Sequence, residues 1–170
     1  MPDEGIWIQS TRDPDGEPVC EITWGRRRWY APVAEVRAAA LDLLTCAAYA
    51  ELMMHLMITL HLDAATMTAM MSDLLSRLRS AEFGTPATVT LMPGGSTKRR
   101  QALVLIKRDR GGAWEAEIDA IEARKMAIRF LEAAEATESD QLVSEALRAT
   151  GACDQAGQEK LFGYLRELRR

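Results

Sequence analysis

The residue types that most enzymes use for chemistry are scarce in this chain. Its 170 residues include only two histidines and three cysteines. His55 and His61 are six positions apart, whereas two ligands on one helix face need a spacing of three or four. The chain contains no Cys-x-x-Cys, His-Glu-x-x-His or EF-hand pattern. We therefore expect no metal, no cofactor and no catalytic residue, and we expect that the protein is not an enzyme.

The cysteines also indicate the compartment. Cys20, Cys46 and Cys153 are odd in number and far apart, which disfavours a disulfide framework and predicts a reducing, cytoplasmic setting. The N-terminal residues 1–5 are acidic and lack an apolar run, so we expect no secretory signal. Arginine greatly outnumbers lysine, as is typical of GC-rich coding genomes, and we interpret the chain as an accessory protein of a bacterium or phage.

Positive charge is not in excess either. The net charge of −4 argues against a surface that binds polyanions everywhere, although a local basic patch can still do so. The glycine-rich stretch at 93–100 lacks the spacing of a phosphate-binding loop and joins two predicted strands, so we interpret it as a hairpin turn at 93–96 with a basic end.

One long apolar run is present, from Leu43 to Leu62, and its length matches a bilayer span. It contains Glu51, His55 and His61, which would be costly in lipid. We therefore expect a helix of a globular protein and no membrane span.

The first half of the chain alternates apolar and polar residues and then becomes helical. Strands are predicted at Ile6–Ile8, at Val19–Trp24 and at Trp29–Tyr30. Turns are predicted at Asp13–Gly16 and at Gly25–Arg28. A helix follows from Val33 to about Ile58, with one apolar face formed by Val36, Ala40, Leu43, Leu44, Ala47 and Met54. Asp63 is a suitable N-cap for a second helix, on which Met67, Met70, Met71, Leu74 and Leu78 form a single stripe.

The second half repeats this order. Strands are expected at Thr88–Met92, at Ala102–Lys107 and around Trp114–Ile118, with a turn at Arg108–Gly112. Asp119 and Glu122 form a capping box for a helix that should end near Glu135. A separate short helix is predicted from Ser139 to Gly151, and Asp154 should cap the last one.

The helices at 35–47 and 122–134 match in sequence at one common offset: Glu35 with Glu122, Arg37 with Arg124, Ala40 with Ala127, Leu44 with Leu131 and Ala47 with Ala134. The sequence therefore predicts an α+β fold with two tandem β-β-β-α units, an internal duplication, and additional helices after each. We place the units at 1–83 and 84–170, as two domains or one fused pseudo-symmetric domain. This order is similar to the general plan of PUR-repeat and Whirly-type single-strand binders, by topology alone and without their motifs.

Methionine provides the first functional hypothesis. Flexible, polarizable thioethers are frequent at surfaces that accommodate partner helices, although core filling is the alternative interpretation. The candidates for a protein interface are Met53, Met54, Met57, Met67, Met70 and Met71. We expect a protein-binding or self-assembling protein, with a protein partner or a homodimer, that interacts through these helices and an open sheet edge.

The second hypothesis is nucleic-acid binding, because bases stack on exposed aromatic rings while nearby cations neutralise phosphates. The candidate residues lie on predicted strands and their turns: Trp7, Arg26, Arg27, Arg28, Trp29, Lys98, Arg99 and Arg100. Solvated hairpin turns are the alternative interpretation of the two basic runs.

Overall fold

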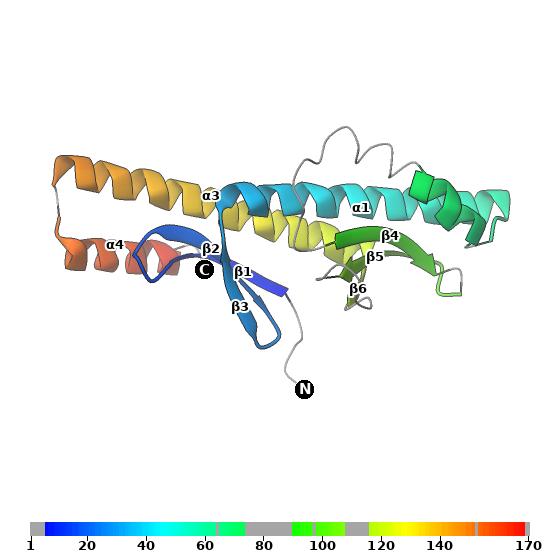
Figure 1. The fold of residues 1–170 in the computed structure, drawn as a ribbon, viewed down its shortest axis with the longest axis horizontal. Coiled ribbons are helices and arrows are strands. Elements are labelled where there is room, and N and C mark those ends of the chain that lie inside the picture. The colour runs from blue at the N-terminus through cyan, green and yellow to red at the C-terminus, as the bar shows by residue number, and fades with distance from the viewer. Residues whose placement is uncertain are drawn as a thin grey trace. The chain divides into compact units, whose positions relative to one another are not determined.

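The structure, a computed structural model, describes residues 6–63, 65–73, 90–96, 98–107, 116–151 and 153–168. Within these ranges the chain forms two three-stranded antiparallel sheets and four helical segments, so the predicted α+β class is confirmed (Figure 1). The chain divides into two compact units. Unit 1 comprises residues 1–40 and 128–170, and unit 2 comprises residues 41–127.

The sheet of unit 1 contains β1 (Ile6–Arg12), β2 (Pro18–Trp24) and β3 (Arg27–Ala31) in the order β1-β2-β3. The predicted turn after β1 is confirmed. The Asp13 carboxylate accepts hydrogen bonds from the amides of Asp15 and Glu17 at 3.0 and 2.9 Å, and Gly16 has a φ of 84°. Aspartate is favoured in this turn because its carboxylate accepts backbone hydrogen bonds, and glycine is favoured because it adopts a positive φ without strain.

The second turn is tighter than predicted. Residues 25–28 were expected to form it, but Trp24 pairs with Arg27, so the loop contains only Gly25 and Arg26. Gly25 has a φ of 59°, the conformation that the first position of a two-residue hairpin loop of type II′ requires. Arg27 and Arg28 consequently belong to β3, and alternation places their side chains on opposite faces.

The sheet of unit 2 contains β4 (Thr90–Ser96), β5 (Gln101–Lys107) and β6 (Ala116–Asp119) in the order β4-β5-β6. The predicted turn at 93–96 is wrong, because β4 continues through it and residues 98–100 form the turn instead. Pro93 pairs with Val104 on an edge strand, where its missing N–H is tolerated. A Cβ at Gly95 would lie 3.4 Å from the Met53 and Met54 side chains, so glycine lets methionine approach the strand closely.

The helices are α1 (Val33–Leu60), the helical segment 65–73, α3 (Ala120–Thr150) and α4 (Gln155–Leu168). The predicted N-caps are confirmed, since Asp63, Asp119 and Asp154 each accept a hydrogen bond from the amide three residues later, at 2.7–2.8 Å. After α1, His61 has a φ of 55°, the left-handed conformation in which many helices end.

The predicted break between two helices near 135–139 is wrong, since α3 is continuous to Thr150 and ends at Gly151 with a φ of 61°. Ser139 does not cap a new helix. Its hydroxyl donates to the Glu135 carbonyl at 2.9 Å, and the Thr137 hydroxyl donates to the Ala133 carbonyl at 2.8 Å. Such bonding to the preceding turn lets both residues remain inside a helix.

Several predicted features lie outside the described residues: the boundary at 83/84, Leu74 and Leu78, the turn at Arg108–Gly112, and Trp114. The compact units combine segments of both predicted halves, because α1 and α3 each contribute residues to unit 1 and to unit 2. Burying an apolar helix face against a sheet supplies the core of each unit.

Candidate functional site

All six candidate methionines belong to unit 2, and five of them are buried. Met53, Met57, Met67 and Met71 form one buried cluster, with Tyr49, Leu56 and Leu62 packed against it, and Met54 is 6% exposed. Met70 is 53% exposed, so the prediction that it shares one stripe with Met67 and Met71 is wrong. The flexible thioethers therefore fill the space between α1, the segment 65–73 and β4, and Met70 is the candidate whose side chain is available to a partner.

The exposed face of α1 was not singled out from the sequence. Within unit 2 six of its exposed residues recur at alternating spacings of four and three: Leu41, Thr45, Ala48, Leu52, His55 and Thr59. Glu51, Ile58 and Leu60 are exposed as well, at the sides of this row. On an α-helix the alternating spacing forms one stripe, which we call the α1 face, opposite the buried residues Leu43, Ala47, Ala50 and Met54. Leu41 and Leu52 on it are 57% and 45% exposed.

The α1 face has no acidic residue, lysine or arginine. Among the helices that the structure describes, α1 is the one long and apolar enough to cross a membrane by length and composition, and 39% of its most apolar window is buried. Glu51, at the side of the α1 face, forms an ion pair with Arg124 of α3 inside unit 2. An apolar helix that is covered on one side only leaves its opposite side for another contact.

The outer face of the first sheet brings Trp7 and Arg28 together with Thr23, Gln9, Glu21 and Tyr30. Strand register forms two rows across it, Trp7–Thr23–Arg28 and Gln9–Glu21–Tyr30. Trp7 is 58% exposed and Tyr30 is 42% exposed, and the Arg28 guanidinium lies 5.7 Å from the Tyr30 ring centroid. An open hollow of about 230 Å³ is lined by Trp7, Ile8, Gln9, Glu21 and Thr23.

Glu21 is the unusual residue of this face, because its side chain is only 6% exposed although it lies on the side away from Cys20 and Ile22. The Arg28 guanidinium donates a hydrogen bond to its Oε2, and this contact raises the pKa of Arg28. Alternation along Val19–Trp24 would have placed Glu21 on the same face as Trp7. The burial of the Glu21 side chain could not be predicted from the residues around it in the sequence, because it depends on side chains of the neighbouring strands.

The other nucleic-acid candidates lie elsewhere. Trp29 is half-buried on the opposite face of the sheet, in register with Ile22. Arg26 and Arg27 are exposed at the β2–β3 turn of unit 1. Lys98, Arg99 and Arg100 are exposed in the β4–β5 turn of unit 2, where the Arg99 amide donates to the Ser96 hydroxyl at 3.3 Å. The two basic turns thus belong to different units.

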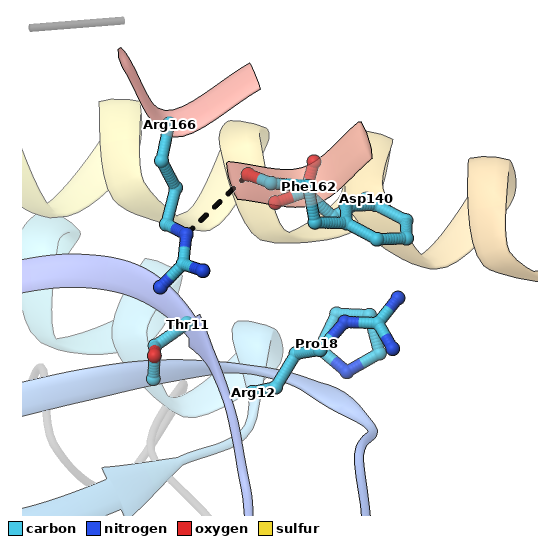
Figure 2. Close-up of a pocket in the computed structure, with 6 residues that line it drawn as sticks. All are labelled: Thr11, Arg12, Pro18, Asp140, Phe162 and Arg166. Atoms are coloured by element: carbon cyan, nitrogen blue, oxygen red, sulfur yellow. Dashed lines mark hydrogen bonds between the residues drawn. The ribbon is translucent and has the colours of Figure 1, made fainter. Parts of the chain in front are cut away.

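A polar network occupies the inner side of unit 1. Ser10 donates to Asp140 at 2.9 Å, Arg12 donates to Ser144 at 3.0 Å, and the Arg12 guanidinium lies 4.0 Å from the Phe162 ring centroid. Figure 2 shows Arg12, Asp140 and Phe162 of this network around a cavity of about 10 Å³, near the minimum that holds one water molecule. This network fixes α3 and α4 on the sheet, and the cavity is too small for a substrate.

The cysteines are free thiols in different surroundings. Cys20 is fully buried, its sulfur lies 3.2 Å from the Thr137 hydroxyl oxygen, and burial raises its pKa. The folded state therefore keeps Cys20 protonated where the unfolded chain ionises, so this thiol lowers stability as the pH rises from its ordinary pKa towards the raised value. Cys46 is also buried, whereas Cys153 is half-buried.

We expect alkylation by iodoacetamide to modify Cys153 first. Because a thiol in a packed core reacts only after local unfolding, Cys20 should react on the order of a hundredfold more slowly. Mass spectrometry of samples quenched over time checks this order at pH 8. Equal rates for Cys20 and Cys153 in the folded protein would contradict the packing of β2 on α3.

No group of three or more histidine, cysteine or acidic residues that could hold a metal ion occurs in the described part of the chain. His55 and His61 are both exposed. Comparison with protein-family models, with curated proteins and with solved structures finds no match to this chain.

Proposed function

We propose that the protein is a non-enzymatic, cytoplasmic binding protein that assembles with a second copy of itself through the α1 face. The observation that carries this proposal is the uncharged stripe from Leu41 to Thr59, which lies opposite the buried side of the same helix. Alternating spacings of four and three are those with which two helices pack along a common seam.

A second copy is the occupant that the face fits best. Large and small residues alternate along it, since Leu41 and Leu52 are separated by Thr45 and Ala48. The leucines of one helix can enter the spaces beside the small residues of another, which is the arrangement that packed helices adopt. A two-fold dimer is the commonest assembly and places the same patch on both sides of the interface.

The size of the face sets the expected affinity. Leu41 to Thr59 covers about 27 Å of a helix about 11 Å wide, a footprint of about 300 Å² per copy. Stable interfaces of standard size bury about 800 Å² per partner, so we expect a reversible dimer with a dissociation constant in the micromolar range.

Light scattering coupled to size exclusion tests the assembly. The mass should rise from one chain to two as the loading concentration increases through the micromolar range. A constant monomer mass up to millimolar concentration would contradict the proposal. Co-flotation with liposomes without dimer formation would instead assign the α1 face to a membrane.

The second candidate function is binding of single-stranded nucleic acid by the outer face of the first sheet. The row Trp7–Thr23–Arg28 favours it, because an exposed ring and a cation are aligned across three strands beside the exposed turn residue Arg26. Base stacking on an aromatic side chain contributes about 1–3 kcal/mol, and cations at the end of the row would contact phosphates.

Trp7→Ala should weaken binding of a short oligothymidylate about tenfold at low salt. Arg26→Glu should weaken it as well and reduce its salt dependence, since it removes a phosphate contact at the exposed turn. Arg129→Glu is the matched control, because Arg129 is an exposed arginine of α3 and not of the strands or their turn. Fluorescence anisotropy of a labelled strand measures all three, and equal losses for Arg26→Glu and Arg129→Glu would indicate only a general effect of the changed charge.

We also infer that the two β-β-β-α units arose by duplication. Ion pairs support this, because Arg37 pairs with Glu138 and Arg124 pairs with Glu51. The offset that aligns Glu35 with Glu122 also aligns Arg37 with Arg124 and Glu51 with Glu138. Each ion pair therefore joins the arginine of one copy to the glutamate of the other. The same offset aligns buried residues with buried residues: Val36 with Ala123, Ala40 with Ala127, Leu43 with Phe130, Ala50 with Thr137, Met53 with Asp140 and Met57 with Ser144.

A further inference from the structure

We propose that the hollow beside Trp7 binds one guanine base of a single strand, with the base stacked on Trp7 and its Watson–Crick edge facing Glu21. This inference rests on the second candidate function, nucleic-acid binding by the outer face of the first sheet. It goes beyond that function because it names the base and the residue that selects it.

The hollow is large enough for a planar ring. Its volume of about 230 Å³ is room for roughly seven water molecules at about 30 Å³ each. Trp7 and Glu21 are diagonal neighbours on adjacent strands, since Trp7 is opposite Thr23. Diagonal neighbours are about 7–8 Å apart, so a base on the Trp7 ring presents its edge to the carboxylate.

Glu21 supplies the chemical selection. Among the described residues Arg28 donates to its Oε2, and because each carboxylate oxygen can accept two hydrogen bonds, Oε1 and Oε2 can still form a bidentate contact with a ligand at the hollow. Because the carboxylate accepts hydrogen bonds, it favours a base edge that carries donors. Guanine carries two adjacent donors there, N1–H and the 2-amino group, whereas thymine and uracil carry one donor between two acceptors.

The remaining polar groups match the rest of a guanine. The Thr23 hydroxyl lies in the same row as Trp7 and can donate to O6, which is an acceptor. Gln9 lies in the row of Glu21, and its amide can donate to or accept from the base or sugar. Arg26 at the adjacent turn is an exposed cation for a flanking phosphate.

The test compares three strands on the unaltered protein: a short oligothymidylate, the same strand with one central guanine, and the same strand with central hypoxanthine. A bidentate contact is worth about tenfold or more in affinity, so guanine should bind about tenfold more tightly than thymine. Hypoxanthine keeps N1–H but lacks the 2-amino group, and its affinity should lie between the two. The fluorescence anisotropy of each labelled strand reports its affinity.

Glu21→Gln should reduce the guanine preference to within about twofold while the thymine strand still binds, because an amide no longer presents two acceptors. Glu17→Gln is the matched control, since this exposed glutamate pairs with Arg148 away from the hollow and its loss removes the same charge. That variant should leave the preference unchanged.

The outcomes separate this inference from the function on which it rests. Tight binding without preference among guanine, hypoxanthine and thymine overturns the guanine site and leaves nucleic-acid binding intact. A preference that persists in Glu21→Gln overturns the role of Glu21. If the unaltered protein binds no strand at low salt, both the guanine site and nucleic-acid binding are overturned. Stronger binding of a short arginine peptide than of any strand would assign the Glu21 hollow to a guanidinium and overturn the proposal.

Discussion

Met67→Ala is expected to lower the free energy of unfolding by about 2–4 kcal/mol, the usual cost of truncating a fully buried large side chain. Met67 is 0% exposed and packs with Met53, Met57 and Met71. Its loss would leave a cavity between α1 and the segment 65–73, because neighbouring side chains relax only in part. Urea denaturation followed by circular dichroism measures the change.

Met70→Ala is the matched control on the same helical segment. Met70 is 53% exposed, so its truncation should change stability by less than about 0.5 kcal/mol. Equal effects of the two substitutions would show that the methionines do not form a core. If both variants kept full stability but lost self-association, the original hypothesis of a methionine interface would be restored.

Leu52→Lys should weaken self-association at least thirtyfold, a change of about 2 kcal/mol, and leave the fold intact. Leu52 is 45% exposed in the single chain, so the lysine remains solvated there and costs little stability. In the dimer it would bury an unpaired charge at the centre of the α1 face, which is strongly unfavourable. Sedimentation equilibrium of the variant and the wild type gives both dissociation constants.

Leu142→Lys controls for the general effect of an added charge. Leu142 is a 63% exposed leucine of α3, outside the α1 face. It should leave the dissociation constant within about twofold of the wild type, which is the scatter expected for surface substitutions. A loss of self-association in Leu142→Lys but not in Leu52→Lys would move the interface to α3.

Local signals in the sequence predicted much of the fold. Asp63, Asp119 and Asp154 marked helix starts correctly, since a cap needs only its own turn. Pro93 and Gly94 were interpreted as a turn, yet they lie in β4 because edge position and methionine packing outweigh their local preference. Ser139 was read as a helix start, and its bond to Glu135 shows the alternative use of the same hydroxyl.

The candidate sites were harder to predict because burial is a property of the assembled unit. The sequence predicted the inward face of α1 correctly, since Val36, Ala40, Leu43, Ala47 and Met54 are all buried. It did not single out the opposite side, because the exposed Leu41 and Leu52 are as hydrophobic as the buried Leu43. Trp7 and the arginines were selected by residue type, whereas the hollow at Glu21 required the register of three strands.

The most direct test of the central proposal measures whether the α1 face is covered in the assembled protein. Thr45→Cys places a thiol of similar size on this face, in a background where Cys153→Ser removes the half-buried cysteine. The alkylation rate at position 45 should fall about tenfold as the protein concentration rises from well below to well above a micromolar dissociation constant. The rate of a Leu142→Cys control should stay constant. An unchanged rate at position 45 in a protein that light scattering shows to be dimeric would contradict assembly through the α1 face.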